Sequence, residues 1–290
     1  MNASLNVGVI GVGNMGGAMA ARLLSLGHRV VVRDIRPEAE AALARPGAQV
    51  APSPAAVAKI ADFIVIAVVD AAQNEAVLFD ETQAVVAGLM RHHVVLLTST
   101  IAPADAASLA QRIAATGAAV LDAPVSGGPQ RARDGSMSMM IGATDADVAR
   151  AQPLLAALSS AVFRVGEKPG QGAAMKLVNN MLAAVNLVAA GEACALAARA
   201  GLDLAAVSKV VNGSSGQSWI FAERAARLLA GDAMPRAHVS LLAKDSALAA
   251  EFARELGLAC DLGKVAAREF ADALVAGLAD ADDSAMLRRR

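Results

Sequence analysis

The sequence Val7-Gly8-Val9-Ile10-Gly11-Val12-Gly13-Asn14-Met15-Gly16 joins a short apolar run to three glycines spaced as G-x-G-x-x-G. The next segment, Ala18–Leu26, is helical in composition. This pattern between a strand and a helix indicates a dinucleotide-binding turn. Gly11 allows the tight turn, Gly13 lets the backbone approach a pyrophosphate, and Gly16 lets the helix pack closely on the strand. The start of the helix then presents free N–H groups to the phosphates.

An acidic residue follows at the distance that is typical of this motif. The β-branched segment Arg29–Arg33 predicts a second strand, and Asp34 lies directly after it, 23 residues beyond Gly11. A carboxylate there hydrogen-bonds the ribose hydroxyls and repels a 2′-phosphate, so the sequence predicts NAD in preference to NADP. Two flanking arginines, Arg33 and Arg36, weaken that preference. An ordinary glycine-rich turn is the alternative, but strand, helix and acidic residue together favour NAD binding.

The rest of the chain changes character near residue 166. The first half alternates Ala-rich helical stretches with fully apolar runs, a pattern that indicates a parallel sheet covered on both faces. Strand signals almost disappear in the second half, which begins with the long helical segment Lys176–Arg199. We therefore predict an α/β Rossmann domain with a mostly parallel sheet over residues 1–166, then a long interdomain helix and an all-α C-terminal domain over residues 167–290. The apolar runs are Phe63–Val69, Val94–Leu97 and Ala118–Val125.

Composition excludes several classes of protein. Of the 290 residues 56% are hydrophobic and 18% are charged, and the net charge of −1 excludes the broad basic surface of a nucleic-acid binder. Two cysteines cannot build a disulfide framework, and four histidines show none of the usual zinc spacings, so no metal is expected.

The membrane question rests on two uncharged stretches. The first 21 residues carry no charge, but they contain five glycines and lack the cationic start of a secretory signal. The longest other uncharged run, between Lys176 and Glu192, has 15 residues, fewer than the roughly 20 of a membrane span. We expect a cytoplasmic protein without a membrane segment.

A second motif, Asp122-Ala-Pro-Val-Ser-Gly-Gly-Pro129, follows a predicted strand. Ligands of open α/β sheets bind beyond the carboxyl ends of the strands, where this motif falls. Ser126 offers a hydroxyl group, and Gly127 and Gly128 offer backbone N–H groups at close approach to an anion. The motif predicts an anion-binding loop, with a plain Pro/Gly turn as the alternative.

A third motif, Gly170–Asn180, opens the long helix. Lys176 and Asn180 are four residues apart and share a helix face, with Asn179 at its edge. Polar side chains in so apolar a stretch are costly to bury unless something uses them. Burial lowers the pKa of a lysine, and such a lysine can act as acid or base. The alternative is a lysine whose amine extends to water.

Together these motifs resemble the β-hydroxyacid dehydrogenase family of the 3-hydroxyisobutyrate dehydrogenase type. Four blocks match in order over nearly the whole chain, namely Gly11–Gly16, Asp122–Gly128, Gly170–Asn180 and Lys244-Asp245. The resemblance implies a Rossmann domain, NAD as cofactor, and a small anionic β-hydroxy acid as substrate. It also implies that the helical domain forms a homodimer or homotetramer interface.

The resemblance assigns roles to individual residues. It implies that Lys176 is the catalytic acid/base and that Lys244 approaches the nicotinamide. The expected substrate-binding residues are Ser126, Gly127, Gly128, Asn180 and Trp219. The expected cofactor-binding residues are Gly11, Gly13, Asn14, Met15, Gly16, Asp34, Val69, Thr100 and Lys244.

Three segments resemble the members of this family that oxidise L-threonate: Ala71–Phe79, Gly216–Phe221 and Asp282–Ala285. L-threonate is therefore the expected substrate. The pair Asn179-Asn180 is instead the commoner family pair, so 3-hydroxyisobutyrate and tartronate semialdehyde remain alternatives. Trp219, the only tryptophan, is either a pocket wall or a core residue.

Other functions compete with this interpretation. A module that senses NAD without turning it over belongs to another class, and Lys176 argues against it. 6-Phosphogluconate dehydrogenases share the Ser-Gly-Gly loop and the lysine, but they are much longer and differ at residue 179. Imine reductases share the fold, but their residue at the lysine position usually differs.

Overall fold

Two units follow one another along the chain, Met1–Lys176 and Leu177–Arg290. The computed structural model describes residues 4–80, 83–232 and 234–289. The division falls inside the long helix α8 (Gln171–Arg199), whereas the sheet ends at Gly166. The first turn of α8 is hydrogen-bonded to Asp122 of the sheet, so this turn belongs to the first unit.

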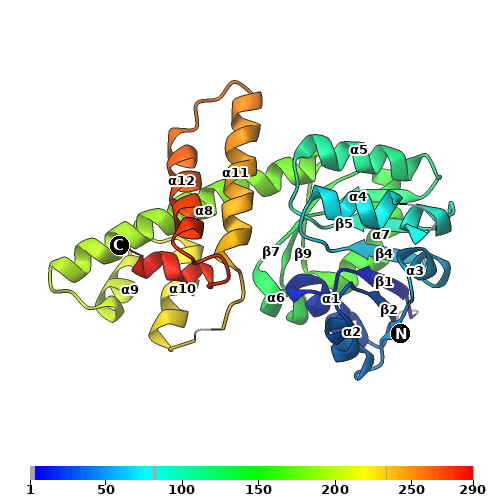
Figure 1. The fold of residues 1–290 in the computed structure, drawn as a ribbon, viewed down its shortest axis with the longest axis horizontal. Helices are drawn as coiled ribbons and strands as arrows, with labels where there is room; N and C mark the ends of the chain where they lie inside the picture. The colour runs from blue at the N-terminus through cyan, green and yellow to red at the C-terminus, as the bar shows by residue number, and fades with distance from the viewer. Residues whose placement is uncertain (1–3, 81–82, 233, 290) are drawn as a thin grey trace. The chain divides into compact units, whose positions relative to one another are not determined.

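The first unit is built on a mostly parallel sheet, which confirms the predicted fold class (Figure 1). Its strands in the described residues are β1 (Asn6–Ile10), β2 (Arg29–Arg33), β3 (Gln49–Val50), β4 (Phe63–Ile66), β5 (Val94–Leu97), β6 (Ala119–Asp122), β7 (Val125–Ser126), β8 (Ser138–Gly142) and β9 (Ala161–Gly166). The order is β3-β2-β1-β4-β5-β6-β8-β7, with β9 paired to β8. The strands β1 to β6 pair in parallel, and β8 runs antiparallel to β6 and β7.

Helices cover both faces of this sheet. Proline in the first turn and a side-chain N-cap mark several helix starts. The hydroxyl of Ser53 accepts a hydrogen bond from the N–H of Ala56, and that of Thr144 accepts one from Asp147. The helical segments are α1 (Asn14–Ser25), α2 (Pro37–Ala44), α3 (Pro54–Ile60), α4 (Ala71–Phe79), η2 (Val85–Gly88, a 3-10 helix), α5 (Pro103–Ala114), α6 (Gly128–Asp134) and α7 (Asp145–Leu158).

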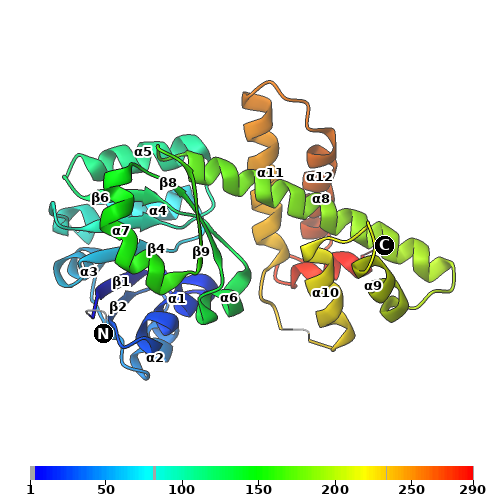
Figure 2. The same ribbon diagram turned by 180° about the vertical axis from the view of Figure 1, so that it is seen from behind.

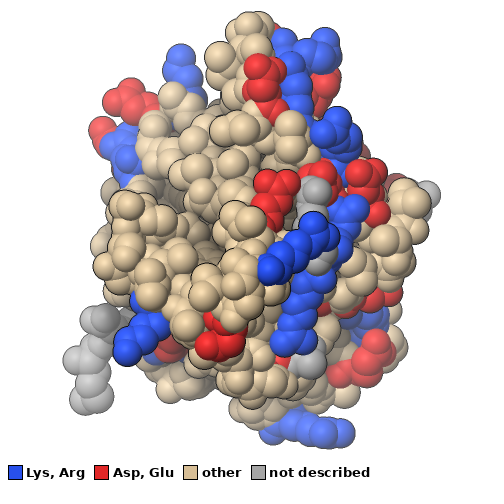
Figure 3. Space-filling model, turned by 90° about the vertical axis from the view of Figure 1, so that its left-hand side faces the viewer, with Lys and Arg blue, Asp and Glu red and all other residues tan. Residues whose placement is uncertain are grey.

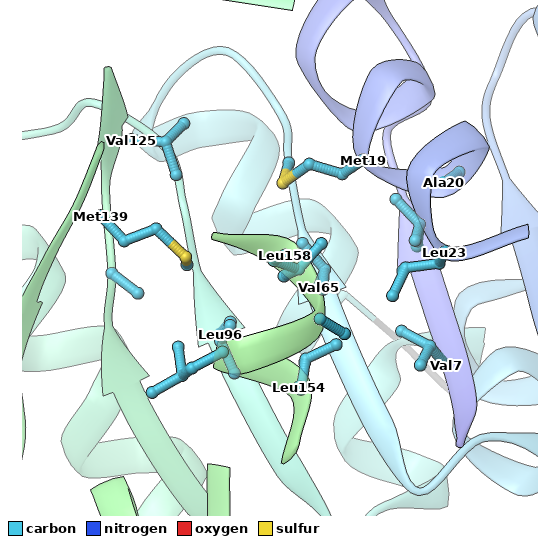
Figure 4. Close-up of a cluster of buried hydrophobic side chains, with 14 of the residues drawn as sticks. Val7, Met19, Ala20, Leu23, Val65, Leu96, Val125, Met139, Leu154 and Leu158 are labelled. Carbon is cyan, nitrogen blue, oxygen red and sulfur yellow. The ribbon is translucent and has the colours of Figure 1, made fainter. Parts of the chain in front are cut away.

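The core of the first unit has two layers because successive strand residues point to opposite faces. On β4, Val65 belongs to the cluster under α1 and α7, whereas Ile64 and Ile66 belong to the cluster under α3 and α5. Figure 4 shows the first cluster, in which Met19 of α1 and Leu158 of α7 lie over the sheet. The sheet is therefore buried on both faces, as the continuous apolar runs predict.

The second unit is helical in its described residues. A single apolar cluster joins its helices, with buried members such as Leu187 of α8 and Phe270 of α12. Val207 and Val211 of α9 are partly buried and pack against this cluster. Arg224 and Arg227 of α10 form ion pairs with Asp283 and Asp282 at the start of the C-terminal helix η3. Besides α8, the helices are α9 (Leu204–Asn212), α10 (Trp219–Leu229), α11 (Val239–Glu255), α12 (Asp261–Val275) and η3 (Asp283–Arg288, a 3-10 helix), seen from behind in Figure 2.

Among the described helices, α8 is long and apolar enough to cross a membrane by length and composition alone, with a mean hydropathy of 1.7 over its most apolar window. The uncharged run between Lys176 and Glu192 is shorter than a membrane span, but α8 continues beyond both of these residues. A single helix of this kind is only a weak sign of a membrane protein, since the core helix of a soluble protein passes the same test.

Candidate active site

The glycine turn after β1 brings three chain segments into close contact. Gly11 has a φ of +83°, and a Cβ atom on it would lie 2.7 Å from the carbonyl oxygen of Ala67, which follows β4. A Cβ atom on Gly16 would lie 1.9 Å from the carbonyl oxygen of Gly11. Only glycine fits either position, so α1 begins pressed against the ends of β1 and β4.

A groove of about 420 Å³ lies beside this turn. The helix α1 has no side-chain cap on its first turn and no acidic residue there, so its backbone N–H groups are available to an anion. Arg36 and Arg133 add positive charge to the lining. These features fit the phosphates of a dinucleotide. The groove is lined by Val12, Gly13, Asn14, Gly17, Ala18, Ala21, Arg36, Ala39, Ala42, Leu43, Pro46 and Arg133.

Asp34 lies at the end of β2 with its carboxylate held by the protein. Its Oδ2 atom accepts the N–H of Val12 at 2.7 Å, and its Oδ1 atom accepts the N–H of Arg36 at 2.9 Å and the Nε–H of Arg36 at 3.1 Å. Burial raises the pKa of Asp34, but these hydrogen bonds outweigh burial and hold the pKa below its usual value. The other flanking arginine, Arg33, pairs instead with Glu40 at 3.0 Å.

The Ser126 loop turns away from the edge of the sheet. Ser126 ends β7 opposite Ser138 of β8. Gly127 and Gly128 then have φ values of +119° and +76°, a region that other residues rarely adopt. Arg131 packs against Gly127, at 2.9 Å from the position of a Cβ atom. The loop therefore needs both glycines, and its half-buried backbone lies beside the serine hydroxyl.

Lys176 is buried on α8, with 7% of its surface exposed. The side chain therefore does not extend into bulk water, which contradicts the alternative interpretation of this lysine. The start of α8 is held by Asp122, whose carboxylate accepts the N–H groups of Gly170 at 2.8 Å and Ala173 at 2.9 Å. Asp122 begins the second sequence motif, but the sequence predicted no role for it.

In the second unit, Asp245 joins two predicted site residues. The Nδ2 atom of Asn180 donates to Oδ2 of Asp245 at 2.6 Å, and the Nζ atom of Lys244 lies 2.7 Å from Oδ1 of Asp245. Asn179 donates to Oδ1 of Asn180 at 2.9 Å. The carboxamide of Asn180 is thus oriented from both sides. Asp245 belongs to the Lys244-Asp245 block that carries the family resemblance, but the sequence predicted no role for it.

The loops after β4 and β5 are tied together beneath the predicted cofactor residues Val69 and Thr100. The hydroxyl of Ser99 donates to the carbonyl oxygen of Val68 at 2.8 Å, and the buried Asn74 donates to that hydroxyl at 2.9 Å. These hydrogen bonds hold the loop that carries Thr100 next to the loop that carries Val69. Asn74 was not among the residues that the sequence singled out.

Trp219 begins α10 and is 55% exposed, so it is not a core tryptophan. The buried residues of that segment are Ile220 and Phe221. Within the described residues, no group of three or more His, Cys, Asp or Glu side chains is placed to hold a metal ion.

Two family models match successive parts of the chain. Residues 6–166 match the family described as the NAD binding domain of 6-phosphogluconate dehydrogenase. Residues 170–289 match the family described as NAD-binding of NADP-dependent 3-hydroxyisobutyrate dehydrogenase. The two matches meet within the segment that leads from β9 into α8.

Known proteins are similar over most or all of the chain. The L-threonate dehydrogenase of Cupriavidus necator is 38% identical over 98% of this chain and 96% of its own. The 3-hydroxyisobutyrate dehydrogenase of Pseudomonas aeruginosa is 39% identical over 74% of this chain and 71% of its own. A solved structure from Salmonella typhimurium, described as 3-hydroxyisobutyrate dehydrogenase, is 38% identical with a TM-score of 0.90 and covers 98% of this chain and 99% of its own.

Proposed function

Because the chain belongs to the 3-hydroxyisobutyrate dehydrogenase-like family of β-hydroxyacid dehydrogenases, and is an NAD-dependent oxidoreductase, we propose that it oxidises L-threonate. The observation that supports this substrate most directly is the extent of the similarity. The threonate relative aligns over 98% of the chain at 38% identity, which includes the helical unit. The 3-hydroxyisobutyrate relative from Pseudomonas aligns over 74% only.

The dinucleotide would be held by the first unit. Gly11, Gly13 and Gly16 bring the backbone to the phosphates, and the uncapped first turn of α1 offers its N–H groups. Asp34 accepts hydrogen bonds from Val12 and Arg36, which both line that groove. When bound, the nicotinamide ring supplies the chemistry of accepting a hydride from the substrate carbon.

The substrate acid would be bound by the Ser126 loop. Its carboxylate accepts hydrogen bonds from the serine hydroxyl and from the N–H groups of Gly127 and Gly128. The neutral amine of Lys176 takes the proton of the substrate hydroxyl as the carbon–hydrogen bond breaks. The C–OH group becomes C=O, the proton resides on Nζ of Lys176, and in the reverse direction the ammonium returns it. Burial of Lys176 keeps this exchange away from bulk water.

Three residues of the second unit stay predictions for this reaction. Asn180 lies one helical turn after Lys176 on α8, so the helix itself places both side chains along one face. Lys244 is predicted to contact the cofactor, and its amine is already paired with Asp245. Trp219, exposed at the start of α10, is predicted to contact substrate.

A second substrate is favoured by one observation. The Salmonella structure, similar over nearly the whole of both chains, is described as a 3-hydroxyisobutyrate dehydrogenase. 3-Hydroxyisobutyrate carries a methyl group on C2 where L-threonate carries a hydroxyl group, and it lacks the terminal CH2OH group that L-threonate has in addition. A pocket that hydrogen-bonds those hydroxyls would discriminate strongly against the methyl compound, because its polar groups would be left unpaired.

A panel of acids tests the proposal. NADH formation is measured with L-threonate, 3-hydroxyisobutyrate, glycerate and L-serine, each with NAD and with NADP. We expect kcat/KM for L-threonate and NAD to exceed every other pair by at least about tenfold. A higher kcat/KM for another acid would identify that acid, in place of L-threonate, as the substrate. Tight NAD binding without turnover of any acid would instead indicate a sensor module.

We also propose that copies of the chain associate through the second unit. Its surface carries many exposed apolar side chains, among them Leu196 at 73%, Leu262 at 70% and Val275 at 90%. The face in Figure 3 has a broad hollowed area that is poor in charged side chains. Apolar surface of this extent marks an interaction site. A homodimer or homotetramer in the cytoplasm would cover it, and light scattering on the purified protein measures the mass directly.

A further inference from the structure

Asp122 is a buried carboxylate that the proposed reaction does not use. It lies at the end of β6 with 1% of its surface exposed. One oxygen, Oδ2, accepts the N–H groups of both Gly170 and Ala173. Burial raises the pKa of Asp122 to about 6, and the N–H groups of α8 oppose that rise. A charged group in such a place is expensive, so its contacts call for an explanation.

The first turn of α8 is docked on the sheet without room for a side chain. A Cβ atom on Gly172 would lie 2.7 Å from the carbonyl oxygens of both Asp122 and Met140. A Cβ atom on Gly142 would lie 2.7 Å from the backbone nitrogen of Gly172. Backbone therefore meets backbone at this point, and the carboxylate of Asp122 closes the contact.

The segment that carries Asp122 also carries the Ser126 loop. Asp122 pairs with Gly142 at one end of β8, and Ser126 pairs with Ser138 at the other. Strand β8 thus holds both ends of this short segment. On the helix side, Lys176 lies less than one turn beyond Ala173, whose N–H group the carboxylate accepts.

We propose that Asp122 is a positioning residue that fixes Lys176 relative to the Ser126 loop by anchoring the first turn of α8 to β6, an inference that rests on the catalytic role proposed for Lys176. Both groups must meet one small acid, the loop at its carboxylate and the lysine at its hydroxyl. A displacement of about 1 Å between such groups costs about 100-fold in rate. All residues of this argument lie in the first unit.

The experiment compares Asp122→Ala with a matched loss of another helix cap. Thr144→Ala removes the N-cap of α7, which carries none of the proposed site residues. Both variants lose a side chain that accepts N–H groups at the start of a helix, so both should have a lower melting temperature than the wild type. We expect Asp122→Ala to lower kcat by about 100-fold, with the Kd of NAD changed by less than about twofold. Thr144→Ala should keep the wild-type kcat.

The conservative variant supplies a second readout. Asp122→Asn retains an acceptor oxygen for the N–H groups of α8, so kcat should return to within about tenfold of the wild type. If Asp122→Ala does not fold, Gly172→Ala takes its place, because its methyl group lifts the helix start and leaves Asp122 and Lys176 intact. A fall of at least about tenfold in kcat with NAD binding kept would support the proposal.

The variant Lys176→Met, measured in the same series, distinguishes failure of the proposed catalytic role of Lys176 from failure of the positioning role of Asp122. Activity is measured with L-threonate, or with the best acid of the panel. Wild-type turnover by Lys176→Met would remove the catalytic role of the lysine, and with it the proposed mechanism. If Lys176→Met is inactive and Asp122→Ala matches Thr144→Ala in kcat, only the positioning role is overturned. A wild-type kcat for Gly172→Ala would likewise overturn only the positioning role.

Discussion

The carboxylate of Asp34 and the guanidinium of Arg36 form an ion pair beside the dinucleotide groove, with Oδ1 3.1 Å from Nε. The arginine side chain is half exposed and lines the groove, whereas the aspartate is almost fully buried. One residue of this pair repels a 2′-phosphate, and the other attracts it. We therefore expect the preference between NAD and NADP to depend on the balance between these two adjacent charges.

We predict that Arg36→Ala sharpens the preference for NAD. Loss of the guanidinium removes a charge-assisted hydrogen bond of about 1.5–3 kcal/mol to a 2′-phosphate, so NADPH affinity should fall by roughly 10- to 100-fold. NADH affinity should change little. Fluorescence titrations of both reduced cofactors measure this. Arg33→Ala is the control, because Arg33 pairs with Glu40. Equal losses for both cofactors would contradict the prediction.

A methyl group at Gly16 should damage cofactor binding and stability together. It would lie 1.9 Å from the carbonyl oxygen of Gly11, so α1 must move away from β1. Overpacking of this kind costs about 1–3 kcal/mol in the free energy of unfolding. Gly213→Ala in the second unit is the control, since a Cβ atom there would lie 3.5 Å from the carbonyl oxygen of Lys209, an ordinary contact distance. Urea unfolding and an NADH titration compare the two variants, and equal behaviour would exclude the close approach as the cause.

Replacement of the buried lysine should abolish turnover but not cofactor binding. Lys176→Met keeps the length and apolar stem of the side chain and removes the amine. Loss of a general acid/base lowers kcat by about 10²- to 10⁴-fold. Lys168→Met is the control, because Lys168 is exposed and precedes the helix. Steady-state kinetics and an NADH titration give the result, and a variant with normal kcat would refute the assigned role.

The pKa of Asp122 predicts an unusual dependence of stability on pH. Its pKa is about 6 in the folded protein against 3.8 ordinarily, so folding favours the protonated acid. Its contribution to the free energy of unfolding is complete below pH 3.8 and decreases as the pH rises to about 6, by about 3 kcal/mol in all. Asp122→Asn does not titrate. Wild type should therefore lose stability relative to this variant between about pH 4 and pH 7 in urea unfolding experiments.

The ion pair of Arg227 and Asp282 should be essential to the second unit. The two side chains are each 6% exposed, with Nη1 3.1 Å from Oδ2. Asp282→Ala leaves a buried guanidinium without its carboxylate, which costs about 3–5 kcal/mol. The wild-type pair should also weaken below about pH 4, because hydrogen bonds that outweigh burial hold the pKa of Asp282 at about 2. Asp280→Ala is the exposed control, and unfolding curves of equal midpoint would contradict the prediction.

Local patterns were enough to predict the parallel sheet, the glycine turn and the helical second half. The residues Gly11 and Gly16 act within one short turn of the chain, and a continuous apolar run is typical of a strand that is buried on both faces. Such features depend on residues only a few positions apart, so they can be predicted from the sequence alone. The family, the cofactor and the class of reaction followed from the same motifs.

Contacts between segments far apart in the sequence could not be predicted from local patterns. Asp122 meets Ala173 across 51 positions, and Asn180 meets Asp245 across 65. No spacing rule relates such pairs, since only the folded chain decides which strand end faces which helix start. The exposure of Trp219 and the end of the first unit at Lys176 depend on packing in the same way. Short-range sequence patterns thus predict the chemistry of the chain. Long-range packing decides which carboxylates hold the predicted site residues in place.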